Sequence, residues 1–211
     1  MKIYIAPIAG VTDYSYRKIL KEFNPDMMFT EMISSNAIVM GNEKTKTDML
    51  KLLPGDAVQL FGKDKDVMLE SAKYIQSIGV KHIKKEVSIP IIGNGDIFTP
   101  EDAYDKVKKS KVDGIMLARG VFGNPWLIRQ IKEKFEFGEV KTIVTDCDKI
   151  EMAKKHLKIL LEDKGNRGIV EMRKHICWYI KGMKNSSKLK NEINKLTKVE
   201  EIEKRLDTFI I

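Results

Sequence analysis

Short apolar runs alternate with amphipathic segments along the first part of the chain. The apolar runs at residues 2–8, 27–30, 56–61, 87–93 and 113–118 predict strands. Between them, apolar positions at helical spacing predict helices, whose start signals are Thr12 or Asp13, Asp64, and Thr99 with Pro100. Strands that alternate with helices predict a parallel sheet covered by crossover helices, which is an α/β architecture.

The pattern changes in the last third of the chain, where only helical spacing remains. We predict helices at residues 148–163, 167–183 and 189–207, and place a domain boundary so that residues 1–137 form the α/β domain and residues 138–211 a helical domain. No apolar run approaches the roughly 20 residues of a membrane span, and no secretory signal is visible. With only two cysteines, Cys147 and Cys177, these features favour a cytoplasmic protein without membrane contact.

Positive charge is concentrated in the C-terminal part. The formal net charge is +8, of which residues 138–211 hold +5, from 17 Lys and Arg against 12 Asp and Glu. Such an excess suggests a polyanionic partner, most often a nucleic acid. A solvated, lysine-rich surface explains the same charge without any partner.

Two glycine-containing loops follow predicted strands and precede predicted helices, at residues 91–96 and 117–120. Glycines at the carboxyl end of a strand let backbone N–H groups converge on an anion, and Arg119 can add a charge-assisted contact. In α/β barrels the loops after the last two strands commonly form a phosphate site. A pair of tight turns with no ligand is the alternative.

Two further features lie where ligands bind in parallel sheets, at the carboxyl ends of strands. The loop at residues 6–10 has small residues that let a flat ring approach the backbone. Gln59 lies within an otherwise apolar strand, and a buried amide needs hydrogen-bond partners. Gln59 therefore makes either a structural hydrogen bond or a contact with a ligand's polar edge.

A basic stripe is expected on the predicted helix at residues 167–183. Arg167, Lys174 and Lys181 recur every seven residues, and Trp178 lies one turn beyond Lys174. Basic residues with an interleaved aromatic suit a phosphate backbone, although most such stripes are only solvated. The three histidines and two cysteines have no metal-ligand spacing, so no metal site is predicted.

Taken in order, these segments resemble the tRNA-dihydrouridine synthases of the bacterial type. The resemblance is carried by residues 6–13, 29–34, 57–62, 92–97 and 119–126, and by residues 171–176 with 191–194 in the helical part. It implies an FMN-containing α/β (TIM) barrel followed by a helical tRNA-binding domain. It also implies an NADPH-dependent oxidoreductase that reduces uridine in tRNA to 5,6-dihydrouridine.

The resemblance also assigns residues to the expected site. Those along or around the flavin are Pro7, Ile8, Ala9 and Gln59, and those that hold its phosphate are Asn94, Gly95, Asp96, Ala118 and Arg119. Those expected to bind tRNA are Arg167, Arg173, Lys174 and Lys181.

One part of the family pattern is missing from this chain. After Ile83 the family continues into a segment with the catalytic cysteine, whereas here Ile83 runs into residues 84–90, which in the family directly precede the phosphate loop. About a hundred residues are therefore expected to be deleted, in keeping with a length below the roughly 250 residues of a full barrel. We expect an incomplete barrel, no residue in the general-acid role, and self-association through exposed sheet edges.

Overall fold

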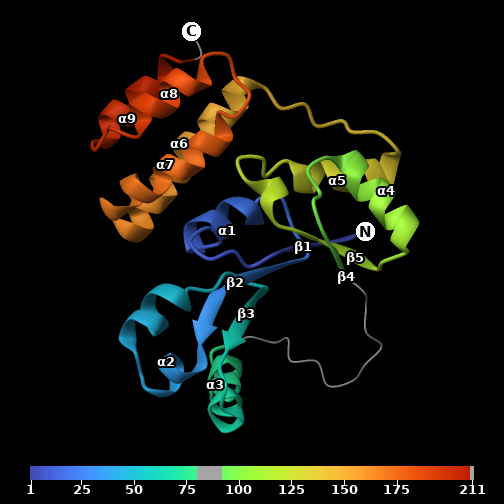
Figure 1. Cartoon of the computed structure of the whole chain (residues 1–211), viewed down its shortest axis with the longest axis vertical. Coiled ribbons are helices and arrows are strands. Elements are labelled where there is room, and N and C mark those ends of the chain that lie inside the picture. Colours follow the sequence, from blue (N-terminus) through green and yellow to red (C-terminus); the bar gives the residue numbers. More distant parts are fainter. Residues whose placement is uncertain (80–91, 210–211) are drawn as a thin grey trace. The chain divides into compact units, whose positions relative to one another are not determined.

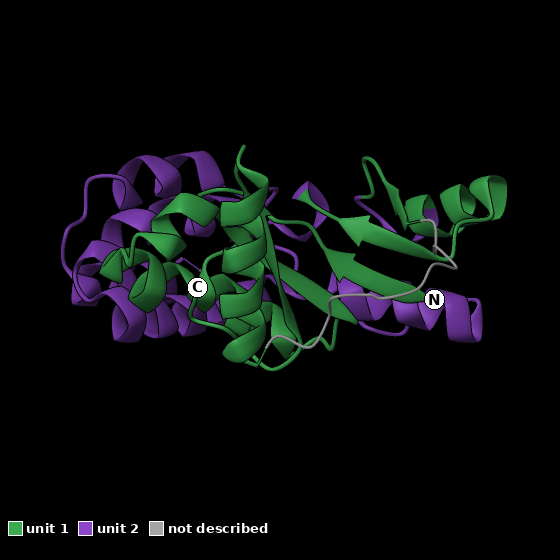
Figure 2. Ribbon diagram, turned by 90° about the horizontal axis from the view of Figure 1, so that it is seen from below, with its two compact units in different colours: residues 1–97, 102–118 green, residues 98–101, 119–211 purple. Residues whose placement is uncertain are grey.

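The structure is a computed structural model that describes residues 1–79 and 92–209, and it divides into two compact units. Unit 1 comprises residues 1–97 and 102–118, and unit 2 comprises residues 98–101 and 119–211 (Figure 2). The domain boundary that the sequence suggests, between residues 137 and 138, stays a prediction.

Unit 1 contains a sheet in which all described pairings are parallel (Figure 1). Its strand order is β3-β2-β1-β5-β4, so that β3 and β4 are the edges. The strands are β1 (Lys2–Ile5), β2 (Met27–Ser34), β3 (Asp56–Phe61), β4 (Ile92–Asn94) and β5 (Gly114–Leu117).

The first strand of the sheet pairs directly with the last. Ile5 lies opposite Leu117 in the parallel register of β1 and β5. A closed barrel requires this pairing of the first strand with the last. It also requires an unbroken ring of paired strands, and here the ring is open between the edge strands β3 and β4. The predicted fold is therefore confirmed: an α/β incomplete TIM barrel is followed by a helical region.

The helices of unit 1 begin where side chains can satisfy their first N–H groups. Asp13 caps α1 by accepting from the N–H of Tyr16, and Asp64 caps α3 by accepting from the N–H groups of Asp66 and Val67. Of the two candidates for the first cap, Asp13 is thus the right one. The helical segments are α1 (Tyr14–Lys21), α2 (Ser35–Val39), the π-helical turn η1 (Thr45–Met49), α3 (Lys65–Ser77) and α4 (Pro100–Ser110), whose first two residues belong to unit 2.

Within its described residues, unit 2 has helices, turns and loops but no strand. It contains the 3₁₀ turn η2 (Arg119–Val121) and the helices α5 (Leu127–Phe137), α6 (Asp146–Lys164), α7 (Arg167–Tyr179), α8 (Ser186–Ile193) and α9 (Val199–Asp207). Helix α6 packs along α7 and also contacts α9. Buried Leu157, Leu160, Met172 and Ile176 belong to the core of this unit.

The prediction of a single helix at residues 189–207 is wrong, because a non-helical segment separates α8 from α9. Both parts bury an apolar pair, Leu189 with Ile193 and Ile202 with Leu206. On one continuous helix these pairs would point about 140° apart, at about 100° per residue. The break lets both pairs face the helical core.

Two other boundaries differ from the prediction. The first strand ends at Ile5 rather than at residue 8, before Pro7, which has no N–H to donate to a sheet. The helix expected at residues 167–183 ends at Tyr179, ahead of Gly182, whose φ is +86°. Most of the strand expected at residues 87–93 lies outside the described residues. Its described part belongs to β4, which begins at Ile92.

The start of α6 gives a pH-dependent prediction. Asp148 accepts hydrogen bonds from the hydroxyl and N–H of Thr145, and these bonds hold the pKa of its carboxyl below its ordinary value. Because the folded pKa lies below the unfolded one, this contribution to stability is present above the unfolded pKa and is lost as pH falls through the folded pKa. Asp148→Asn is therefore expected to flatten the decline of unit 2 stability as the pH falls below the ordinary Asp pKa of about 4. Urea titrations at several pH values measure the decline, and the exposed Glu136→Gln is the control; equal curves for the two variants contradict the prediction.

Candidate functional site

The candidate site is the carboxyl edge of the parallel sheet in unit 1. The loop after β1 holds Pro7, Ile8 and Ala9, whereas Asn94 ends β4 and is followed by Gly95 and Asp96. Ala118 follows β5, the strand between them in the sheet. Because all these strands are parallel, their carboxyl ends meet at one edge, where ligands bind in such sheets.

The loop after β1 is held by several hydrogen bonds. The carbonyl oxygen of Ile8 accepts from the N–H groups of Val11 and Thr12, each at 3.0 Å, and the N–H of Ile8 donates to Thr12 Oγ1 at 2.8 Å. The N–H of Gly10 donates to the carboxylate of Glu31 from β2. Pro7 and Ile8 are half-buried and Ala9 is exposed. The loop is therefore fixed, and its exposed residue Ala9 has a small side chain, which suits contact with a flat ring.

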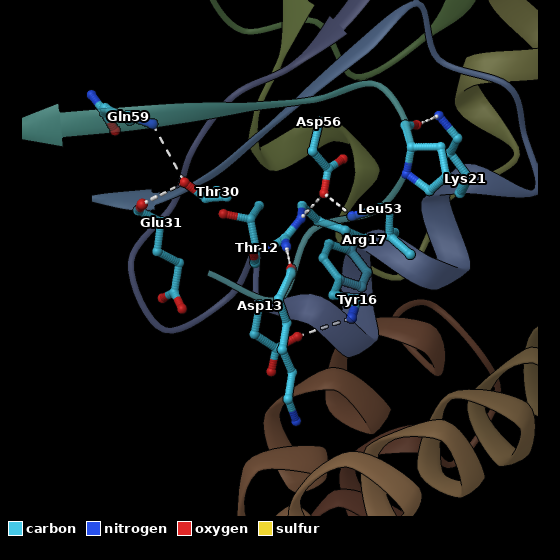
Figure 3. Close-up of polar contacts among 12 residues, drawn as sticks. Thr12, Asp13, Tyr16, Arg17, Lys21, Thr30, Glu31, Leu53, Asp56 and Gln59 are labelled. Carbon is cyan, nitrogen blue, oxygen red and sulfur yellow. Dashed lines mark hydrogen bonds and ion pairs between the residues drawn. The ribbon is translucent and has the colours of Figure 1, made fainter. Parts of the chain in front are cut away.

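Arg17 lies beside this loop in the core of unit 1 (Figure 3). Its guanidinium donates to the carbonyl oxygen of Thr12 at 2.7 Å, to Asp56 Oδ2 at 2.9 Å and to the carbonyl oxygen of Lys51 at 2.6 Å. Arg17 is 2% exposed and Asp56 is 4% exposed. This buried ion pair joins α1 and the end of the loop to the start of β3, so it positions one side of the site.

No sequence pattern singled out Arg17 or its partner Asp56. A usable signal was present, because Asp56 opens an otherwise apolar strand and Arg17 follows Tyr16 inside an amphipathic helix. A charge at the start of a buried strand needs an opposite charge nearby. Only the fold identifies which one it finds.

The loop after β4 has a backbone that favours glycine and short polar residues. Gly95 has a φ of +156° and Asp96 a φ of +38°. From α4, the ammonium of Lys106 donates to the carbonyl oxygens of Gly95 at 2.8 Å and of Asp96 at 2.6 Å. Lys106, which no sequence pattern marked, therefore orients this loop and places a positive charge beside it.

Gln59 is less enclosed than its position in an apolar strand suggested. Its side chain is half-buried, and both alternatives for it, a structural hydrogen bond and a contact with a ligand, stay predictions. Its backbone N–H donates to Thr30 Oγ1 at 3.3 Å, and the hydroxyl of Thr30 donates to the carbonyl oxygen of Glu31 at 2.9 Å (Figure 3). These bonds fix the backbone of β3 at Gln59 and do not involve its amide side chain.

The remaining phosphate-site candidate, Arg119, belongs to unit 2. It opens the turn η2, is exposed, and its guanidinium carbon lies 5.8 Å from the centre of the Phe98 ring. This contact with an aromatic face orients the side chain within that unit.

The predicted RNA-binding residues lie in or just after α7. Arg167 and Lys174 are on the helix, and Arg173 Nη2 donates to the carbonyl oxygen of Leu196 at 2.7 Å. Lys181 lies beyond the last residue of α7, so the expected repeat of three basic residues along one helix is wrong. Trp178 stacks on Phe122 with ring centres 4.4 Å apart, so this aromatic packs inside the unit.

Two buried or partly buried groups of unit 2, His175 and Cys177, are poorly suited to acid–base chemistry near neutral pH. His175 is 2% exposed, and burial together with neighbouring His156 lowers its pKa to about 2. Burial raises the pKa of the Cys177 thiol, and exposed Cys147 lies in the first turn of α6. Both cysteines of the chain thus belong to the helical unit, outside the loops of the sheet.

Within residues 1–79 and 92–209, no helix is long and apolar enough to cross a membrane, and no three His, Cys, Asp or Glu side chains gather as metal ligands do.

The fold and site define an α/β protein that has ligand-type loops at the carboxyl edge of an incomplete parallel barrel, with a helical region after it. A family model described as "Dihydrouridine synthase (Dus)" matches residues 4–84 and 75–210. The chain therefore belongs to the dihydrouridine synthase family.

Individual relatives agree with this assignment. A "Probable tRNA-dihydrouridine synthase 1" from Synechocystis sp. is 35% identical over 131 residues, which cover 62% of this chain and 37% of that relative. A "Probable tRNA-dihydrouridine synthase" from Rickettsia conorii is 23% identical, with 91% of this chain and 88% of the relative covered. "tRNA-dihydrouridine synthase B" from Pasteurella multocida is also 23% identical, with 95% and 90% covered.

Proposed function

We propose that this chain is an internally shortened, flavin-binding tRNA-dihydrouridine synthase of the cytoplasm. It would bind FMN at the carboxyl edge of its sheet and tRNA through its helical region. The observation that carries the proposal is the meeting of residues 7–9, 94–96 and 118 at one sheet edge, although up to 111 residues separate them along the chain. A flavin mononucleotide needs an apolar surface for its ring and a loop for its phosphate, and the residues at this edge would supply both.

The residues present fit part of this cofactor. Pro7, Ile8 and Ala9 would lie along the ring, and the half-buried Gln59 would hydrogen-bond its polar edge. The phosphate would be held by Asn94, Gly95, Asp96, Ala118 and Arg119, and Lys106 beside that loop adds favourable charge. FMN held by these residues would supply the redox chemistry of the family, in which NADPH is the reductant and uridine in tRNA is reduced.

The proposed deletion removes the proton donor. The alignment with the Rickettsia conorii relative runs over 291 positions, more than the 211 residues of this chain. The family model matches in two parts that meet at residues 75–84. Both observations support an internal deletion that includes the cysteine segment expected after Ile83. Since Cys147 and Cys177 lie in the helical unit, we assign no residue of this chain to the general-acid role.

A second function is favoured by the charge distribution. Residues 138–211 carry +5 and contain every proposed RNA contact, Arg167, Arg173, Lys174 and Lys181. This region would bind tRNA even without a cofactor, as a non-catalytic remnant of the enzyme. The sheet edges β3 and β4 would then favour self-association.

The visible absorbance spectrum of the purified chain tests the proposal. We expect a bound-flavin band and no dihydrouridine in tRNA after incubation with NADPH. Arg119→Ala is expected to weaken FMN binding about tenfold, or about 1.4 kcal/mol, through loss of a charge-assisted contact. Flavin fluorescence titration measures the change, and Arg129→Ala, an exposed arginine of α5, is the matched control.

Each other outcome is informative. A colourless protein that binds tRNA supports the non-catalytic remnant and refutes the flavin site. Formation of dihydrouridine overturns the absence of a proton donor. Equal losses in the two arginine variants would show that Arg119 acts only through overall charge.

A further inference from the structure

The positive charge of the helical region is concentrated around α8. Residues 181–195 hold five lysines and one glutamate, a net charge of +4. The other residues of the range 138–211 hold 12 Lys and Arg against 11 Asp and Glu, so their charges almost cancel. The five lysines, which we call the α8 basic surface, are Lys181, Lys184, Lys188, Lys190 and Lys195.

The charge of these lysines is not compensated within the unit. Lys190 is half-buried, and the other four are exposed. In the part of the chain that the structure describes, none of the five takes part in an ion pair. By contrast, Lys154 of α6 pairs with both Glu151 and Asp207. The basic residues of α6 are thus partly neutralised, whereas those around α8 are available to an anion.

The one acid of this segment is engaged by another cation. Glu192 accepts a hydrogen bond from Arg205 of α9, and this bond holds the pKa of its carboxyl below its ordinary value. Lys188 and Lys195 lie one helical turn before and after Glu192, and among the described residues neither forms an ion pair with it. Because Glu192 already shares its charge with Arg205, it offsets little of the lysine charge.

Packing of α8 turns its polar side outward. Leu189 and Ile193 are 1% and 0% exposed and form the buried face of this helix, which contacts α7 and α9. At about 100° per residue, Lys188 lies about 120° from the middle of that face and Asn191 about 180° from it. The exposed side of α8 therefore carries lysine and amide groups.

The same surface extends toward α7. Burial raises the pKa of the Cys177 thiol, and the positive charge of Lys190 lowers it in part, so Lys190 lies near this residue of α7. Lys174 precedes Cys177 by one helical turn, and Lys181 follows shortly after the end of α7. Lysines of two segments thus gather on one side of the unit.

A basic surface of this composition fits RNA better than a membrane. The large apolar side chains of residues 181–195, Met183, Leu189 and Ile193, are all buried. A helix that lies in a membrane interface needs an exposed apolar face. A phosphate backbone needs only accessible cations, whose binding releases the counterions of the nucleic acid.

We propose that the α8 basic surface binds the phosphate backbone of tRNA. The proposal rests on the proposed tRNA-binding function and moves its main contact from α7 to the lysines in and beside α8. Of the RNA-binding residues expected from the sequence, only Lys181 belongs to this surface. The guanidinium of Arg173, another of them, already donates to the carbonyl oxygen of Leu196.

Binding of a tRNA transcript to the full-length chain, followed by fluorescence anisotropy at several salt concentrations, tests the surface. Lys184→Gln with Lys188→Gln is expected to weaken binding about tenfold at about 0.1 M salt. It is also expected to reduce the steepness of log affinity against log salt concentration by about 2, or about 1 for each lost phosphate contact. Lys158→Gln with Lys204→Gln removes the same charge from exposed lysines of α6 and α9, and is expected to weaken binding less than about threefold. Circular dichroism checks that each variant is folded.

The outcomes separate this proposal from the one it rests on. Absence of tRNA binding by the unmodified chain overturns both. Equal weakening in the two glutamine double variants overturns the α8 basic surface alone, because overall charge then explains binding. Lys184→Arg with Lys188→Arg keeps the charge and is expected to bind as the unmodified chain does, so loss of binding there would refute an electrostatic contact.

Vesicles of phosphatidylserine and phosphatidylcholine test the membrane alternative. We expect no binding to them. Vesicle binding that Lys184→Gln with Lys188→Gln abolishes, together with an unchanged affinity of that variant for tRNA, would identify a membrane surface as the partner and overturn the proposal.

Discussion

Arg17→Met is expected to lower the free energy of unfolding of unit 1 by about 3–5 kcal/mol. The substitution leaves Asp56, which is 4% exposed, as a buried charge without its cation. It also removes the hydrogen bonds to the carbonyl oxygens of Thr12 and Lys51. Since a domain is stable by only about 5–15 kcal/mol, this loss is large. Urea denaturation followed by circular dichroism measures it.

Two variants show whether the buried charge is the cause. Arg17→Met with Asp56→Asn removes both charges and keeps an acceptor for the N–H of Leu53, so we expect it to be more stable than Arg17→Met alone. Lys154→Met breaks an exposed ion pair with Asp207 and is expected to cost at most about 1 kcal/mol. A double variant that is less stable than the single one would contradict this account.

Gly123→Ala is expected to destabilise unit 2 by about 2–4 kcal/mol. The φ of Gly123 is +64°, which costs an L-residue about 1 kcal/mol. In addition, its Cβ would lie 2.3 Å from the carbonyl carbon of Trp178 and 2.5 Å from the N of Tyr179. Both obstacles are backbone atoms at the end of α7, so the helix must shift, and overpacking of this kind costs about 1–3 kcal/mol.

Gly138→Ala is the matched control for this prediction. Gly138 ends α5 with a φ of +79°, but a Cβ there meets nothing within 4 Å. Only the backbone strain remains, so we expect a loss of about 1 kcal/mol. The difference between the two variants in thermal melting isolates the close approach of Gly123 to α7. Equal losses would show that no close approach exists.

Much of the fold was predictable because its signals are local. The strand at residues 56–61 coincides with β3, and the helix after Asp64 coincides with α3, closed by Gly79. In both cases apolar spacing and the terminal residues point to the same element. Boundaries failed where distant packing decided them, as at the break between α8 and α9.

The candidate site was predictable only in part. The loops at residues 6–10 and 91–96 follow strands, and parallel strands must present those loops at one edge. Arg17 and Lys106 make the contacts that hold the loops. Each contact joins separate segments of the chain, and no local sequence pattern predicts that these segments lie close together. Trp178 is a residue type expected to contact RNA, yet its ring stacks on Phe122.

By itself the sequence determined the alternation of strands and helices, the family, and the uneven charge, because each depends on residue types in order along the chain. The tertiary structure decided that β1 pairs with β5 and that Arg17 neutralises Asp56. These outcomes depend on which surfaces meet when the chain buries its apolar side chains, so they follow from packing over the whole unit and not from any one segment.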